Sequence, residues 1–147
     1  MEQQVRIRIR GTQKYKEKEM GEDTTALETL GQYYFRNGSH YITFSEKDPQ
    51  GQGEINSILK IKEETVELTR KGSIGTKMLF EREKEYSTMY TTPCGAMKMT
   101  IRTQGVRVLK TEKKLTLNIQ YTSWLEDIEI ADNRLEVVIR ALAFSFI

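Results

Sequence analysis

The sequence has few residues of several types, and each shortage argues against a class of protein. Cys94 is the only cysteine among 147 residues, so the chain can form neither an internal disulfide nor a thiolate cluster for zinc. His40 is the only histidine, and no spacing of His, Asp and Glu around it is typical of a metal site or a catalytic triad. We therefore expect no metal, no cofactor and no familiar hydrolase chemistry, and a reducing compartment.

Long apolar runs are also missing. Val5, Ile7 and Ile9 alternate with arginines near the start of the chain, a pattern that neither a signal peptide nor a membrane span tolerates. We expect a cytoplasmic protein with no membrane segment. The 23 basic and 21 acidic residues nearly balance, which predicts no strong overall field for nucleic acid. No Walker loop or G-x-G-x-x-G motif for nucleotides occurs either.

Apolar residues recur instead at every second position, which indicates strands with one buried face and one solvated face. The predicted strands cover residues 5–10, 26–36, 41–46, 54–62, 65–70, 77–85, 86–92, 96–103, 113–125 and 135–143. Asn37-Gly38 predicts a hairpin, and residues 48–53 predict a turn. Roughly eight to ten strands with short connections favour one all-β domain over residues 1–147, an antiparallel closed or nearly closed barrel.

Two segments are open to other interpretations. The charges of residues 80–90 also suit a short helix, although we predict a strand. Residues 127–133 are predicted as a wide loop or a one-turn helix.

A set of ordered motifs resembles a known family. The pieces are Gly31-Gln32-Tyr33-Tyr34, Tyr41-Ile42-Thr43-Phe44-Ser45-Glu46, Arg70-Lys71-Gly72, Phe80, and Tyr90-Thr91-Thr92-Pro93-Cys94-Gly95 before a strand that ends at Thr103. They resemble the YwiB-like bacterial proteins of unknown function. That resemblance implies a calycin, or lipocalin-like, β-barrel of bacterial origin, and it transfers no catalytic residue. Cys94 departs from the bulkier apolar residue expected in its turn, so we interpret it as packing rather than thiol chemistry.

Glu46 and Arg70 are charged residues at positions where the strand pattern predicts inward side chains. Glu46 follows Ile42 and Phe44 at the same parity, and Arg70 follows Val66 and Leu68. A buried unpaired charge is costly, so these two must meet each other, water or a ligand. They therefore form either a structural ion pair, buried or at the barrel mouth, or the polar anchor at the bottom of a ligand cavity.

Other residues are weaker candidates for the interior. Arg82 has the parity of Phe80 and would join Glu46 and Arg70 if its segment were extended. Tyr34, Tyr90 and Tyr121 belong to a set of tyrosines that could line a cavity, fill the core or lie half exposed.

Three further basic residues, Arg6, Arg8 and Arg10, form a stripe on the outer face of the first strand. This stripe could contact phosphates. We expect instead that acidic residues on an adjacent strand compensate it, because only an uncompensated patch binds nucleic acid.

Three functions stay open at this point. The leading hypothesis is a non-enzymatic module that binds a small, partly apolar ligand inside the barrel. The second is a structural or interaction protein with a filled interior, which acts through its surface or as a homodimer. The third, an enzyme with an unfamiliar carboxylate site around Glu46 and Arg70, is the least favoured.

Overall fold

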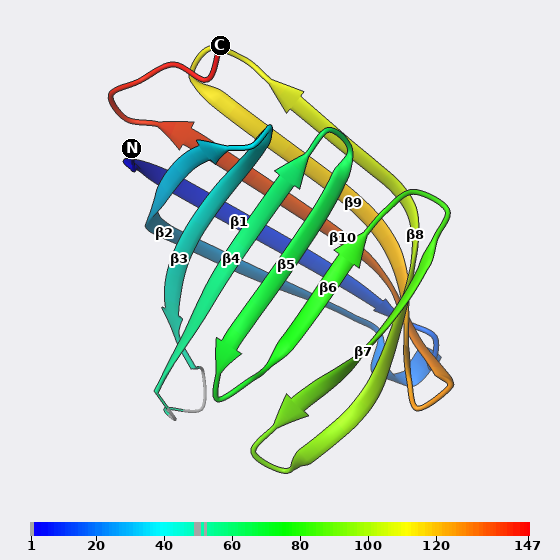
Figure 1. Cartoon of the computed structure of the whole chain (residues 1–147). Helices are drawn as coiled ribbons and strands as arrows, with labels where there is room; N and C mark the ends of the chain where they lie inside the picture. The colour runs from blue at the N-terminus through cyan, green and yellow to red at the C-terminus, as the bar shows by residue number, and fades with distance from the viewer. Residues whose placement is uncertain (1, 49–50, 52) are drawn as a thin grey trace.

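The computed structural model describes residues 2–48, 51 and 53–147, and it has a single ten-stranded antiparallel sheet (Figure 1). The strands are β1 (Gln3–Tyr15), β2 (Glu22–Arg36), β3 (Ser39–Lys47), β4 (Glu54–Lys62), β5 (Thr65–Gly72), β6 (Thr76–Phe80), β7 (Glu85–Thr92), β8 (Gly95–Lys110), β9 (Lys114–Leu125) and β10 (Ile128–Ala141). One turn of 3-10 helix, η1 (Lys18–Met20), connects β1 to β2. The all-β prediction is confirmed.

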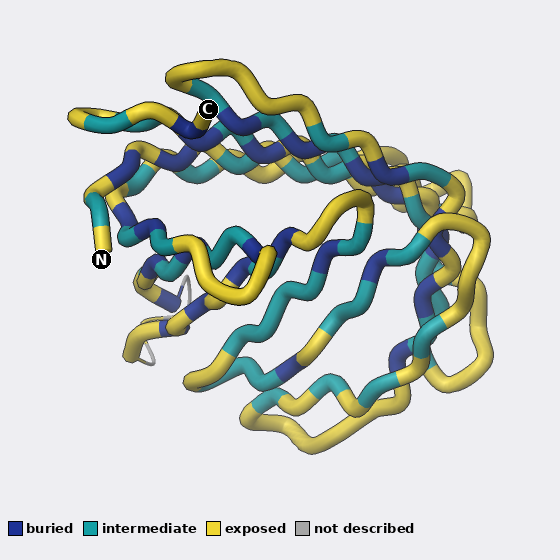
Figure 2. Tube along the Cα trace, turned by 45° about the horizontal axis from the view of Figure 1, so that its top comes forward, coloured by how far each residue is buried: buried dark blue, intermediate teal, exposed yellow. Residues whose placement is uncertain are grey.

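The sheet curls into a nearly closed barrel. Its strand order is β6-β5-β4-β3-β2-β1-β10-β9-β8-β7, so the first strand pairs with the last, and the two edges, β6 and β7, are consecutive in the chain. An isolated bridge between Gly75 and Thr91 joins these edges, with N–H to O distances of 2.8 and 2.9 Å. Buried and exposed positions alternate along the strands, as the period of two predicts (Figure 2).

The hairpin turns explain where the predicted elements and the structure agree or differ. Asn37 and Gly38 both have positive φ, at 51° and 79°, and form the predicted turn between β2 and β3. Glu126 and Asp127 form a similar turn, with φ of 49° and 70°, so β10 begins at Ile128. The prediction of a loop or helix over residues 127–133 is therefore wrong.

The segment after β6 also differs from the prediction. We predicted one strand over residues 77–85, but β6 ends at Phe80 and a turn with Glu83 at φ 63° precedes β7. The helix alternative for residues 80–90 is not found, since residues 85–92 are strand.

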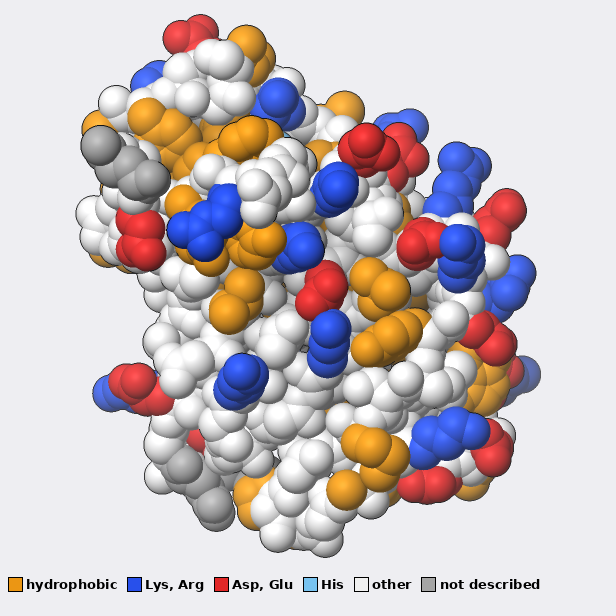
Figure 3. Space-filling model, in the orientation of Figure 1, with side chains coloured by type: hydrophobic (Ala, Val, Ile, Leu, Met, Phe, Trp, Pro, Cys, Tyr) orange, Lys and Arg blue, Asp and Glu red, His pale blue; other side chains and the backbone are white. Residues whose placement is uncertain are grey.

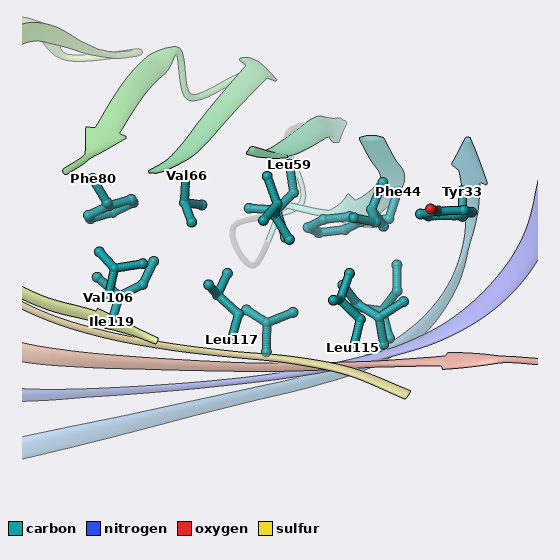
Figure 4. Close-up of a cluster of buried hydrophobic side chains, with 14 of the residues drawn as sticks. Tyr33, Phe44, Leu59, Val66, Phe80, Val106, Leu115, Leu117 and Ile119 are labelled. Atoms are coloured by element: carbon teal, nitrogen blue, oxygen red, sulfur yellow. The ribbon is translucent and has the colours of Figure 1, made fainter. Parts of the chain in front are cut away.

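One half of the interior is filled by apolar side chains. Figure 4 shows the side chains of the two walls facing each other: Phe80, Val66 and Leu59 opposite Ile119, Leu117 and Leu115. Residues after β10 cover this end, because Phe144 stacks on the Tyr33 ring at 5.2 Å and Phe146 contacts it edge-on at 5.1 Å. The Tyr33 hydroxyl and His40 Nδ1 are hydrogen-bonded at 2.7 Å. Apolar packing therefore fills the interior at the end that Phe144 and Phe146 cover.

Candidate functional site

A cavity of about 690 Å³ lies at the end of the barrel opposite Phe144 and Phe146, and we call it the mouth cavity. Its apolar lining includes Ile9, Leu27, Phe44, Leu68, Met78, Phe80 and Leu135. Its polar lining includes Thr12, Gln13, Thr25, Glu46, Lys47, Ser57, Arg70, Tyr121, Asn133 and Arg134. Strands from both walls of the barrel supply these side chains.

An ion pair between Glu46 and Arg70 lies in this cavity. Arg70 Nη2 donates a hydrogen bond to Glu46 Oε1 at 2.9 Å, and the two side chains are 28% and 22% exposed. Their inward orientation follows from strand parity, since Phe44 and Val66 on the same faces are buried. Of the partners left open by the sequence, the two side chains meet each other, and their partial exposure places the pair at the mouth rather than in the sealed core.

Tyr121 on β9 reaches the same cavity from the opposite wall. Its ring packs on Phe80 with centroids 4.9 Å apart. Burial raises the pKa of Tyr121 to about 12, and the nearby positive charge of Arg70 acts in the other direction. The phenol is therefore neutral at physiological pH and can donate a hydrogen bond to a guest molecule.

Ser57 and Asn133 carry buried polar atoms in the cavity wall that have no hydrogen-bond partner among the described residues. These atoms are Ser57 Oγ and Asn133 Oδ1. The Asn133 amide nitrogen is well anchored, because it donates to Ser123 Oγ at 3.0 Å, to the Ala131 carbonyl at 3.2 Å and to the Tyr121 carbonyl at 3.3 Å. Only the amide oxygen is left over. An unmatched buried acceptor costs about 1–3 kcal/mol, which a bound donor would offset.

Sequence reasoning missed both of these residues. Ser57 lies between Ile55 and Leu59 at the inward parity of β4, so the alternation could have identified it. Asn133 could not be found in this way, because its segment was predicted as a loop or helix.

The remaining predicted residues do not line the mouth cavity. Arg82 is exposed in the turn after β6, and its predicted inward position is wrong because the strand ends two residues earlier. Tyr34 lies on the outer face, where its ring stacks on Tyr41 at 4.8 Å, because its neighbour Tyr33 takes the inward position. Tyr90 packs against the core from β7. Cys94 is exposed in the hairpin between β7 and β8, so its interpretation as a packing residue is wrong.

Within residues 2–48, 51 and 53–147, no group of three or more His, Cys, Asp or Glu side chains is placed to hold a metal ion. None of the helices in this part of the chain could cross a membrane.

Comparison with known proteins identifies relatives of the chain. A family model described as "Domain of unknown function (DUF1934)" matches residues 7–137. The crystal structure of the ywiB protein from Bacillus subtilis has the same fold, with a TM-score of 0.84 and 15% sequence identity over 97% of this chain and 94% of that chain. No curated protein sequence matches. The resemblance found in the sequence motifs is confirmed. At 15% sequence identity, the structural similarity shows that the two chains share the barrel fold, and no more.

Proposed function

This chain belongs to the DUF1934 family, and from that premise we propose that it binds a small, partly apolar organic acid in its mouth cavity without transforming it. The observation that carries the proposal is the partly exposed guanidinium group of Arg70 in a cavity with many apolar side chains, whose wall also holds two buried oxygens without partners among the described residues, Ser57 Oγ and Asn133 Oδ1. A bound ligand that supplies hydrogen bonds to these polar groups of the cavity wall would stabilise the protein.

The size and lining of the cavity support a small molecule. A volume of about 690 Å³ falls within the range of about 300–1,000 Å³ that is typical of small-molecule sites. Such sites have mainly apolar walls and a few convergent polar groups. Leu68, Met78 and Phe80 supply apolar surface directly beside Arg70 and Tyr121.

An acidic group on the ligand follows from the charges. Arg70 and the exposed Lys47 line the cavity against a single carboxylate, Glu46, so the lining carries an excess of positive charge without Arg134, whose side chain has the outward parity of β10. Arg70 uses one terminal nitrogen for Glu46, and its planar guanidinium has further N–H donors for a second carboxylate. The neutral Tyr121 hydroxyl adds another donor.

Binding without catalysis fits the positions of the reactive side chains. His40 lies at the apolar end of the barrel, bonded to Tyr33, and Cys94 is exposed in the hairpin between β7 and β8. Neither side chain lines the mouth cavity beside Glu46. A free exposed thiol also suits the reducing cytoplasm that we propose as the location.

The filled-barrel alternative has support from the apolar half of the interior. An interaction protein that acts through its surface needs nothing more from its core than packing, and residues such as Leu117 and Phe80 supply that. The filled-barrel alternative does not explain, however, why polar atoms without partners in the described part of the chain lie around an open cavity. We therefore favour ligand binding.

Native mass spectrometry of freshly purified protein tests the proposal, because it reports both a retained ligand and the oligomeric state. We expect a retained mass that is lost in Arg70→Met and kept in Lys62→Met, a matched change on an exposed lysine outside the cavity. Octanoate serves as a probe in parallel, with octanol as the control that lacks the carboxylate. Absence of any retained mass, together with equal binding of octanoate to wild type and Arg70→Met, would refute the proposal.

A further inference from the structure

The outer face of β2, β1, β10, β9 and β8 carries an excess of positive charge. We call it the basic face and define it by the paired rows from Arg6 to Lys14. Its basic residues are Arg6, Arg8, Arg10, Lys14, Arg102, Arg107, Lys114, Arg134 and Arg140, and its acidic residues are Glu22, Glu28, Asp132 and Glu136. The excess of five positive charges exceeds the net charge of the whole chain, which is +2.

The densest part of this face is a row of three basic side chains on neighbouring strands. Arg6 is directly opposite Arg140 in the β1–β10 pair, and Arg140 is directly opposite Lys114 in the β10–β9 pair. None of the three forms an ion pair within the described part of the chain. Like charges directly opposite one another destabilise a sheet. The row therefore lowers stability, as expected for a surface that serves a function.

The acidic compensation expected for the arginine stripe of β1 is incomplete. Arg8 pairs with Glu28 on β2, but the distance is 3.7 Å and both side chains are more than half exposed. Arg6 has no acidic partner on either side, because it is opposite Leu30 on β2 and Arg140 on β10. Arg10 is opposite Ala26 on β2 but faces Glu136 on β10. By contrast, the face drawn in Figure 3, over β4 to β7, has basic and acidic side chains interspersed.

A shallow groove of about 730 Å³ continues the basic face over β8, β9 and β10. Three arginines and two carboxylates line it together with side-chain amides such as those of Asn118 and Gln120; the charged residues are Arg82, Arg107, Arg134, Glu64 and Glu136. Amides supply both donors and acceptors, which suits sugar hydroxyls and base edges next to phosphates.

We infer that the basic face binds the backbone of single-stranded RNA, independently of the mouth cavity. Alternate residues of a strand repeat at about 6.8 Å and neighbouring strands at about 4.8 Å, so the rows offer closely spaced phosphate contacts. The face is the convex outside of a barrel. A flexible single strand can follow such a surface, whereas a duplex with a persistence length of about 50 nm touches it at few points.

Fluorescence anisotropy with a labelled oligo(U) of about 12 nucleotides tests the inference at low salt. We expect Arg140→Glu to weaken binding by about tenfold or more, and Lys62→Glu, the same charge change on a lysine outside the basic face, to change it by less than about twofold. Each lost phosphate contact should also reduce the slope of log K against log salt by about 0.7.

Folding does not confound this comparison. Arg140→Glu puts a carboxylate between Arg6 and Lys114, so its melting temperature should equal or exceed that of wild type. Three outcomes would overturn the inference: no binding of oligo(U) by wild type, equal weakening by the two variants, or binding of phosphatidylserine vesicles or duplex RNA but not of oligo(U).

Discussion

Glu46 on β3 and Arg70 on β5 form their ion pair across β4, a strand that separates the two. Ser57 on β4 is directly opposite Arg70 and also directly opposite Phe44. The pair therefore ties together strands that share no backbone hydrogen bonds, and Ser57, whose hydroxyl has no partner among the described residues, is on the strand between them.

A double-mutant cycle measures the contribution of this pair. We expect Glu46→Gln to lower the free energy of unfolding by about 1–2 kcal/mol, because it leaves a partly buried guanidinium without its carboxylate. Arg70→Gln should lower the free energy of unfolding less in the Glu46→Gln background than it does in wild type. Urea denaturation gives these values.

The exposed pair of Arg8 and Glu28 is the control for that cycle. Its side chains are 58% and 59% exposed, so Glu28→Gln should change the free energy of unfolding by less than about 0.5 kcal/mol. Equal effects of Glu46→Gln and Glu28→Gln would contradict the role that we assign to the mouth pair.

Acid should destabilise the protein through His40. Burial, with repulsion from Lys110 as a smaller cause, lowers the pKa of His40 below 6.5 in the folded chain. The unfolded chain therefore binds this proton more readily, so stability is complete above about pH 6.5 and falls as the pH drops below that value. Urea unfolding between about pH 8 and pH 5.5 measures the slope, which His40→Gln should reduce.

Alkaline titration provides a test of the environment of Tyr121. Because its folded pKa of about 12 exceeds the unfolded value of 10.0, its contribution to stability is complete below about pH 10 and is lost as the pH rises towards 12. The ultraviolet absorbance of tyrosinate should show a late-titrating component in wild type. Tyr121→Phe should lack this component, and its presence in that variant would assign it to another tyrosine.

Gly31 is a position where any side chain is too large. An added Cβ would lie 2.5 Å from the Thr43 carbonyl oxygen and 2.5 Å from Ile7 Cδ1. We expect Gly31→Ala to lower the free energy of unfolding by about 3 kcal/mol, since the backbone of β3 and the core side chain must both shift. Gly105→Ala, whose Cβ would meet nothing closer than 4.0 Å, should change the free energy of unfolding by less than about 1 kcal/mol. Thermal denaturation compares the two.

The alternation of residues was enough to predict the strands and the inward direction of Glu46 and Arg70. That is because the strand period fixes the face of every residue once a buried neighbour such as Phe44 is recognised. The same rule fails for adjacent residues of one type. Tyr33 and Tyr34 point to opposite faces, and only the pairing of Gly31 with Val5 decides which tyrosine lies inside.

Turns were the other limit of prediction. Glu83, Glu126 and Asp127 adopt positive φ although none is glycine or asparagine, the residues that best mark such turns. Sequence rules therefore extended the strand through Arg82 and missed the start of β10. Asn133 was lost to the site for this reason, because its partners on β9 become evident only when residues 128–141 are a strand.

The division of the interior into a packed half and a half that contains the mouth cavity separates two kinds of selection on this chain. Substitutions among Leu115, Leu117 and Ile119 are constrained by folding, whereas exchanges at Ser57 or Asn133 alter mainly what the barrel can hold. Relatives could thus diverge in cargo while they keep one architecture. A similarity of barrels at low sequence identity is compatible with many different guests.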